Sequence, residues 1–181
     1  IELGAKVIDH VMKSVESGNL HLGTHDILPN ASITPLKIHA GTSSLSVPDS
    51  CLIEFDRHLV PPETPESVLK QLKACINEVL DFENFEIRKS IRPTPFLLPF
   101  VTPIDSKIAK IAISSLESLG YTVRISGGNS VAVENMLSSP YYQTPILHAI
   151  PTIGLGCKGG NYHKENEWVD LDSLENNQIA L

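Results

Sequence analysis

A glycine-rich loop near the end of the chain places one histidine and two carboxylates within five residues, His163-Lys-Glu-Asn-Glu167. The loop follows an apolar run at residues 150–155. A neutral imidazole at the end of a strand commonly holds zinc, and nearby carboxylates can ligate the metal or orient the ring. Zinc requires three or four protein ligands, and His163 is the single metal ligand that the sequence offers. A solvated surface histidine remains an alternative on spacing alone.

Two glycine motifs could contact a ligand through the backbone. Gly154-Leu-Gly-Cys-Lys-Gly159 matches G-x-G-x-x-G, but a polar loop follows where dinucleotide binding needs a helix, so tight turning is the better interpretation. Ser126-Gly127-Gly128-Asn129-Ser130 follows a predicted strand and precedes a short helix. Backbone N–H groups at such a junction suit an anion such as a carboxylate, although glycines at a strand end often serve turn geometry alone.

The remaining candidates are weaker. His25 and His39 lie in loop and edge-strand contexts that indicate surface histidines rather than metal ligands. Asp56-Arg57-His58 ends a predicted strand and could be either a salt-bridged terminus or a substrate contact. No Ser-His-Asp arrangement or nucleophile elbow has supporting context, so nucleophilic catalysis is not indicated.

Composition narrows the function classes. The 181-residue chain has a net charge of −7 and no basic stripe, which argues against nucleic-acid binding. No apolar run approaches the ~20 residues that span a bilayer. Three cysteines without C-x-x-C spacing, Cys51, Cys75 and Cys157, predict free thiols and a reducing, cytoplasmic setting. The chain opens on Ile1 rather than Met, from which we expect a processed or truncated product.

The elements that must position these residues fall into two groups. Hydrophobic periodicity and turn signals in the first half predict helix, strand, strand, helix and strand, at residues 3–17, 32–39, 50–56, 65–80 and 85–91. Pro35 predicts that the first strand lies at an edge, and Thr64-Pro65 predicts a helix start. With one more strand in front, this order is that of a ferredoxin-like sandwich.

A proline-rich segment separates the two groups, with four prolines among residues 92–103. Beyond it we expect alternating helices and strands, at residues 104–119, 121–125, 131–138, 150–155 and from 170 onward. The predicted fold class is therefore mixed α/β (α+β), with domains at residues 1–95 and 96–181.

Together these segments resemble the zinc-dependent aminoacylase/glutamate carboxypeptidase family, which includes acetylornithine deacetylase and succinyl-diaminopimelate desuccinylase. Three matches carry the resemblance. Val47-Pro-Asp-Ser-Cys51 through Asp56-Arg-His-Leu-Val-Pro-Pro-Glu63 is similar to V-P-x-x-C followed by D-x-R-x-x-P-G-E; Ser126-Gly-Gly-Asn-Ser130 is similar to S-G-G-T-D; and Ile150-Pro-Thr-Ile-Gly154 with His163-Lys-Glu-Asn-Glu167 is similar to the family's ending.

The resemblance implies a fold and an activity. Residues 1–95 would be the ferredoxin-like dimerising lid without its first strand, and residues 96–181 the last part of a two-zinc catalytic domain. His163 would be the final zinc ligand, while His58, Gly127, Gly128 and Asn129 would contact substrate. The family's other ligands and its glutamate base would precede Ile1. The family hydrolyses N-acyl amino acids or peptides by metal-assisted attack of water.

Three positions depart from the family pattern. His58 stands where the family has a substrate-binding arginine, Leu45 where asparagine is usual, and Ser130 where aspartate is usual. We therefore expect either a fragment or truncated homologue of a metallo-amidohydrolase, inactive alone, or a non-catalytic homodimerising module of the same fold. A ferredoxin-like small-molecule sensor is a third option. A homodimer through the lid is expected in the first two cases.

Overall fold

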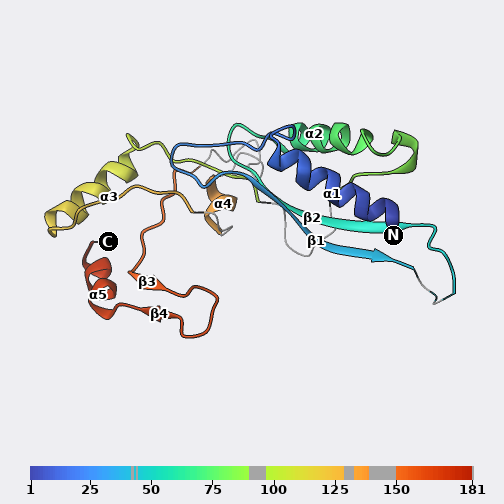
Figure 1. Ribbon diagram of the computed structural model, residues 1–181. Helices are drawn as coiled ribbons and strands as arrows, with labels where there is room; N and C mark the ends of the chain where they lie inside the picture. Colours follow the sequence, from blue (N-terminus) through green and yellow to red (C-terminus); the bar gives the residue numbers. More distant parts are fainter. Residues whose placement is uncertain (42, 44, 90–96, 129–132, 139–149, 181) are drawn as a thin grey trace. The chain divides into compact units, whose positions relative to one another are not determined.

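The computed structural model describes residues 1–41, 43, 45–89, 97–128, 133–138 and 150–180 (Figure 1). The chain divides into two compact units. The first comprises residues 1–99 with 127–130, and the second comprises residues 100–126 with 131–181. The fold is mixed α+β. The predicted domain boundary between residues 95 and 96 falls outside the described residues.

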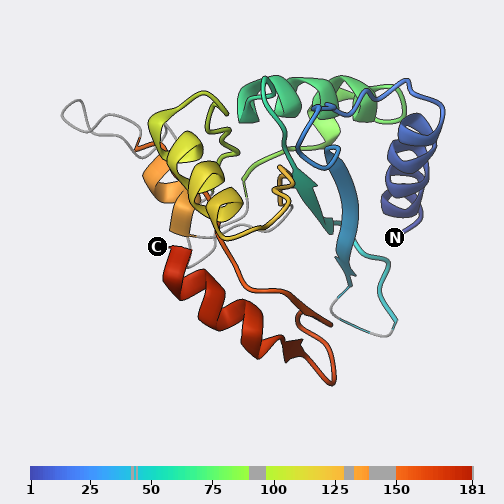
Figure 2. The same ribbon diagram turned by 90° about the vertical axis from the view of Figure 1, so that its left-hand side faces the viewer.

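The first unit is a two-stranded antiparallel sheet covered on one face by two helices, as Figures 1 and 2 show. The elements are α1 (Glu2–Glu16), β1 (Ser32–Ala40), β2 (Cys51–His58), α2 (Pro65–Asn77) and a short 3₁₀ helix η1 (Phe82–Asn84). The two predicted helices and the first two predicted strands are present within a few residues of their expected bounds.

Local sequence signals account for the helix ends. Thr64 and Ser67 form a reciprocal capping box at the start of α2, with Pro65 in the first helical turn. Gly18 follows α1 with φ of 78°, a left-handed conformation that favours glycine. Two i, i+4 pairs line α1, and a hydrogen bond from Lys6 lowers the pKa of Glu2.

The core of this unit joins both helices to the sheet. Val11 of α1 is completely buried, and Ile33 of β1 and Leu72 of α2 belong to the same cluster. The first turn of α1 comes especially close to β2 at Gly4. A Cβ atom on Gly4 would lie 2.6 Å from Cys51 Sγ, so the absence of a side chain is what permits this approach.

The strands pair from Ser32 opposite His58 to Ala40 opposite Cys51, with a register shift between Pro35 and Lys37. Proline cannot donate a ladder hydrogen bond, and irregularities of this kind accommodate it. The outward face of the sheet carries an ion pair, in which Lys37 Nζ lies 3.1 Å from Glu54 Oε2, and the exposed Leu52.

The strand predicted at residues 85–91 is not formed over residues 85–89, and residues 90 and 91 lie outside the described part of the chain. Phe85 and Ile87 nevertheless pack against the core, as their alternation predicts. A strand also needs a backbone ladder to a neighbour, and the sheet of the described residues contains β1 and β2 only. Side-chain alternation was therefore a correct indicator of packing and a wrong indicator of sheet membership.

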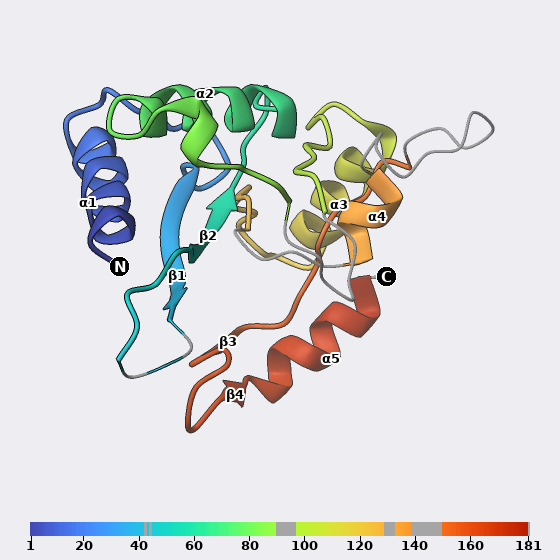
Figure 3. The same cartoon turned by 90° about the vertical axis from the view of Figure 1, so that its right-hand side faces the viewer.

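The described residues of the second unit form three helices and a small hairpin, which can be followed in Figure 3. They are α3 (Lys107–Ser118), α4 (Val133–Ser138), β3 (Gly159–Gly160), β4 (Trp168–Val169) and α5 (Leu171–Ala180). Ser106 caps α3, Gly120 ends it with φ of 84°, and α3 packs against α5. No helix in the described ranges is long and apolar enough to cross a membrane.

The strands predicted at residues 121–125 and 150–155 are wrong: both segments lack strand pairing. In the second, the Thr102 side chain takes the place of a ladder partner. Thr102 Oγ1 donates to the carbonyl of Thr152 at 2.5 Å and accepts the Thr152 N–H at 3.1 Å. A hydroxyl can do both, so it satisfies this backbone position without a neighbouring strand.

Candidate functional site

The end of β2 carries two adjacent basic residues on opposite faces. Because side chains alternate along a strand, Arg57 turns inward and His58 turns outward. Arg57 Nη2 lies 2.5 Å from Glu63 Oε1, and the two side chains are 9% and 12% exposed. Arg57 Nη1 also donates to the carbonyl of His58. Arg57 is thus engaged in a nearly buried ion pair that ties the strand end to the following turn.

Besides its ion pair with Arg57, Glu63 accepts hydrogen bonds from two backbone N–H groups. Its Oε1 accepts the Gly23 N–H at 3.0 Å, and its Oε2 accepts the Val60 N–H at 3.0 Å. A Cβ atom on Gly23 would lie 2.7 Å from Glu63 Cδ, so glycine permits this contact. A carboxylate removed from water needs such charge-assisted bonds. The glutamate of the P-P-E motif therefore joins the loop at Gly23, the end of β2 and the turn before α2.

His58, a predicted substrate contact, lies on the outward face of the sheet. Its Nε2 is 3.1 Å from Asp56 Oδ2, and the two side chains are 44% and 48% exposed. A carboxylate at one ring nitrogen fixes how imidazole is oriented and leaves the other nitrogen for a ligand. Arginine at this position would present a permanent charge, whereas histidine presents a group that gains its charge only on protonation.

The glycine turn predicted to contact substrate packs against a loop of the first unit. The Gly127 N–H donates to the Ile27 carbonyl at 2.7 Å. A Cβ atom on Gly127 would lie 2.3 Å from Leu28 Cδ2 and 2.7 Å from the Ile27 oxygen, so only glycine fits without displacement. Gly128 follows in the described chain, and Asn129, also predicted to contact substrate, lies outside the described residues.

His25 has a role that the sequence did not indicate. We expected a surface histidine, but the residue is half-buried and its Nδ1 accepts the N–H groups of Ile27 at 3.2 Å and Leu28 at 3.4 Å. No sequence signal indicated this role, because local side-chain caps of this kind are expected of Ser, Thr, Asn and Asp rather than of histidine.

His163, the predicted zinc ligand, lies in the loop between β3 and β4 and is exposed. Three non-glycine residues of this loop, Asn161, His163 and Asn166, have φ values of 57°, 59° and 58°. Non-glycine residues adopt this region rarely, and asparagine and histidine are among those that tolerate it. Asn161 Nδ2 donates to the carbonyl of Asn166 at 3.1 Å, which closes the loop. Strained backbone of this type is concentrated at functional sites.

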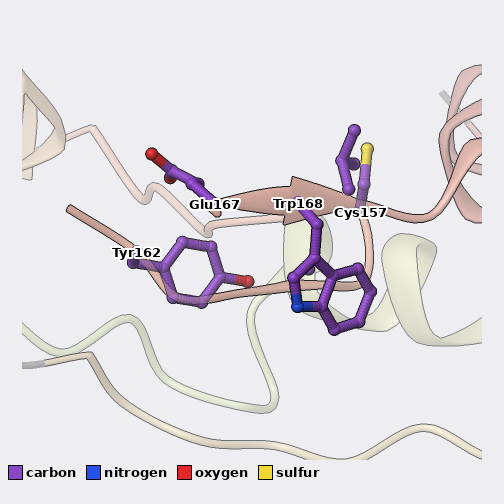
Figure 4. A pocket seen from close by; sticks show the side chains of 6 residues that line it. Cys157, Tyr162, Glu167 and Trp168 are labelled. Atoms are coloured by element: carbon purple, nitrogen blue, oxygen red, sulfur yellow. The ribbon is translucent and has the colours of Figure 1, made fainter. Parts of the chain in front are cut away.

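A shallow hollow of about 310 Å³ adjoins this loop (Figure 4). The Tyr162 hydroxyl is turned toward the Trp168 indole, and Glu167 points away from both rings. Gly160 pairs opposite Trp168, and a Cβ atom on Gly160 would lie 2.7 Å from Trp168 Nε1. The indole therefore lies over a backbone position that has no side chain. The sequence signal was the Gly-Gly pair preceding a tryptophan, which we interpreted only as turn geometry.

The described residues do not form a zinc site. Within the ranges given above, no group of three or more histidine, cysteine, aspartate or glutamate residues is placed to hold a metal ion. His163 alone falls short of the three or four ligands that zinc requires. The three cysteines are free thiols, as expected, and none extends the ligand set.

Comparison with protein families gives one match. Residues 1–83 match the family described as the peptidase dimerisation domain, M20_dimer. This range contains α1, β1, β2 and α2, together with the Arg57–Glu63 pair. Comparisons with curated proteins and with solved structures gave no match.

Proposed function

Because residues 1–83 of this chain are a dimerisation domain of the M20 peptidase family, we propose that the chain is part of a metal-dependent amidohydrolase or metallopeptidase. Its substrates would be N-acyl amino acids or peptides. The family match is the observation that carries the proposal. The D-R-H-L-V-P-P-E segment lies inside the matched range, and its Arg57 and Glu63 belong to one hydrogen-bonded network.

In this proposal each part of the chain has a role. Residues 1–95 act as a ferredoxin-like lid that pairs with a second copy, and residues 96–181 contribute to the catalytic domain. His58 on the outward sheet face and the glycine turn Gly127-Gly128-Asn129 contact the substrate's carboxylate. His163 serves as one zinc ligand, which agrees with its exposed position and left-handed backbone.

Zinc, when bound in such enzymes, polarises the scissile carbonyl and lowers the pKa of a bound water. The described residues do not fit a complete zinc site, so we assign no catalytic step to them. We therefore expect the 181-residue chain to be inactive by itself. What its residues contribute is one imidazole, a carboxylate-binding backbone turn and an imidazole–carboxylate pair.

A second candidate is a non-catalytic homodimerising module. The observation that favours it is the environment of the altered positions. His58 is paired with Asp56 where the family has a substrate-binding arginine, and Leu45, where asparagine is usual, is 98% exposed. Neither residue provides the amide or guanidinium donors that would recognise a carboxylate.

Zinc titration by calorimetry separates the two candidates. We compare the chain as given with His163→Ala and with His39→Ala, which removes another exposed histidine. Zinc binding that is lost in His163→Ala and kept in His39→Ala would support a metal site completed by this chain or its dimer mate. Equal titrations for all three proteins would favour the dimerising module. Light scattering on the same samples should give twice the 19.8 kDa chain mass, and a monomer at high concentration would contradict both candidates.

A further inference from the structure

A four-residue turn, His25-Asp-Ile-Leu28, holds the glycine turn that the proposed function uses. The contact is a backbone hydrogen bond of 2.7 Å from Gly127 N–H to the Ile27 carbonyl. The backbone at Gly127 and the backbone at Leu28 approach so closely that a side chain would not fit: a Cβ atom on Gly127 would lie 2.9 Å from Leu28 Cα. The position of Gly127 is therefore set by where the turn places the Ile27 carbonyl.

The His25 ring determines the shape of this turn. Its Nδ1 accepts two backbone N–H groups, from Ile27 at 3.2 Å and from Leu28 at 3.4 Å. Both bonds require a lone pair on Nδ1. A doubly protonated imidazole has no acceptor. Its Nδ1–H would then point at the N–H groups of Ile27 and Leu28, and neither hydrogen bond could form.

We propose that His25 is a positioning residue for the glycine turn. By accepting the two N–H groups it orients the Ile27–Leu28 peptide units, and the Ile27 carbonyl then anchors Gly127. This places the N–H group of Gly128, which in the proposed function binds the substrate's carboxylate. That last step rests on the proposed function, whereas the anchoring of Gly127 by the turn does not.

Within the described ranges, the ion pairs that involve a histidine are His10–Glu78 and His58–Asp56, so His25 has no carboxylate partner. Asp26 is its ionisable neighbour on the turn and is exposed, and Gly127 and Gly128 carry no ionisable side chain. Glu63 reaches the preceding loop at Gly23, where it is paired with Arg57. Protonation of His25 is therefore expected to act on the turn through the lost acceptor rather than through a new ion pair.

Hydrogen exchange of the Gly127 amide, measured by NMR on the full chain, tests the anchoring. His25→Ala should speed exchange of this amide roughly tenfold, the effect of losing about one hydrogen bond of stabilisation. Amides of α2 should keep their protection, which checks that the variant is folded. His21→Ala is the matched control, since it removes an exposed histidine from the same loop and should leave Gly127 unchanged.

A conservative variant distinguishes the acceptor role from a general structural one. In His25→Asn the side-chain oxygen can accept the N–H two residues on, at any pH. Between pH 8 and pH 5 the parent should lose Gly127 protection beyond the intrinsic pH effect, and His25→Asn should not. If His25→Ala does not fold, this comparison decides the question. Equal Gly127 protection in His25→Ala and His21→Ala, or identical pH profiles in the parent and His25→Asn, would overturn the proposal.

Titration with N-acetylglycine separates this inference from the proposed function. A shift of the Gly128 amide signal that weakens in His25→Ala supports both. An anchored Gly127 whose neighbour does not respond to N-acetylglycine supports the positioning role of His25 and counts against carboxylate binding at the glycine turn.

Discussion

Arg57 and Glu63 form a nearly buried ion pair, 2.5 Å long, that joins the end of strand β2 to the residue before the N-cap of α2. The two residues are six positions apart in the sequence. Two backbone N–H groups, those of Gly23 and Val60, donate hydrogen bonds to the same carboxylate. It lies inside the dimerisation-domain match. Its role in the first unit is structural: it holds His58 at the strand end and the helix start in fixed positions.

Replacing Glu63 should therefore destabilise the first unit. Glu63→Ala leaves Arg57 and two N–H groups without their acceptor, and we expect the free energy of unfolding to fall by about 3 kcal/mol. Urea denaturation followed by circular dichroism measures the change. Glu86→Ala, at an exposed position, is the control and should change the value by less than about 0.5 kcal/mol. Equal effects of the two substitutions would contradict the assignment.

The residue beside Arg57 should behave differently. His58 is half-exposed and its partner Asp56 is too, so His58→Ala should change the free energy of unfolding by less than about 1 kcal/mol. Arg57→Ala should be several times more destabilising. The same denaturation assay compares the two adjacent substitutions. A large loss for His58→Ala would mean that the outward face of β2 is packed rather than free for a ligand.

Gly4 offers a test of the contact between α1 and β2. Glycine to alanine in a helix normally stabilises by about 1 kcal/mol, but here the new Cβ would meet Cys51 Sγ at 2.6 Å. We expect Gly4→Ala to destabilise by about 1–3 kcal/mol. In a Cys51→Ala background the same change should be neutral or stabilising. A double-mutant cycle from four denaturation curves gives the coupling, and additive effects would rule out the contact.

The hairpin beside His163 can be followed through the single tryptophan of the chain. Gly160→Ala should displace the Trp168 indole, because the added Cβ would lie within 3.0 Å of three of its ring atoms. We expect a shift in the emission maximum and a change in iodide quenching. Gly156→Ala is the matched control, since a Cβ there has nothing within 4 Å. Identical spectra for both variants would show that the indole does not lie over Gly160.

Short-range signals predicted the helices well and the strands unevenly. The Thr64-Pro65 start of α2, which was predicted, and the glycines after α1 and α3 depend on groups a few residues apart. The segments at 85–91, 121–125 and 150–155 carry strand-like composition, but whether a strand forms depends on a distant backbone neighbour. Thr152 illustrates the point, since its backbone is satisfied by the hydroxyl of Thr102, fifty residues away.

The site residues divide in the same way. The motif residues His58, Gly127, Gly128 and His163, and the opposite faces of Arg57 and His58, follow from the sequence, because motif spacing and strand alternation are local properties. The contact partners of these regions do not follow from the sequence. Glu63 contacts Gly23, Ile27 contacts Gly127, and Trp168 lies over Gly160. Each of these contacts joins loops whose approach depends on the packing of whole elements, and each is possible because a glycine leaves room for the neighbouring atom. Tertiary packing alone could select those partners, since the sequence shows where a side chain is missing but not which atom will occupy the space.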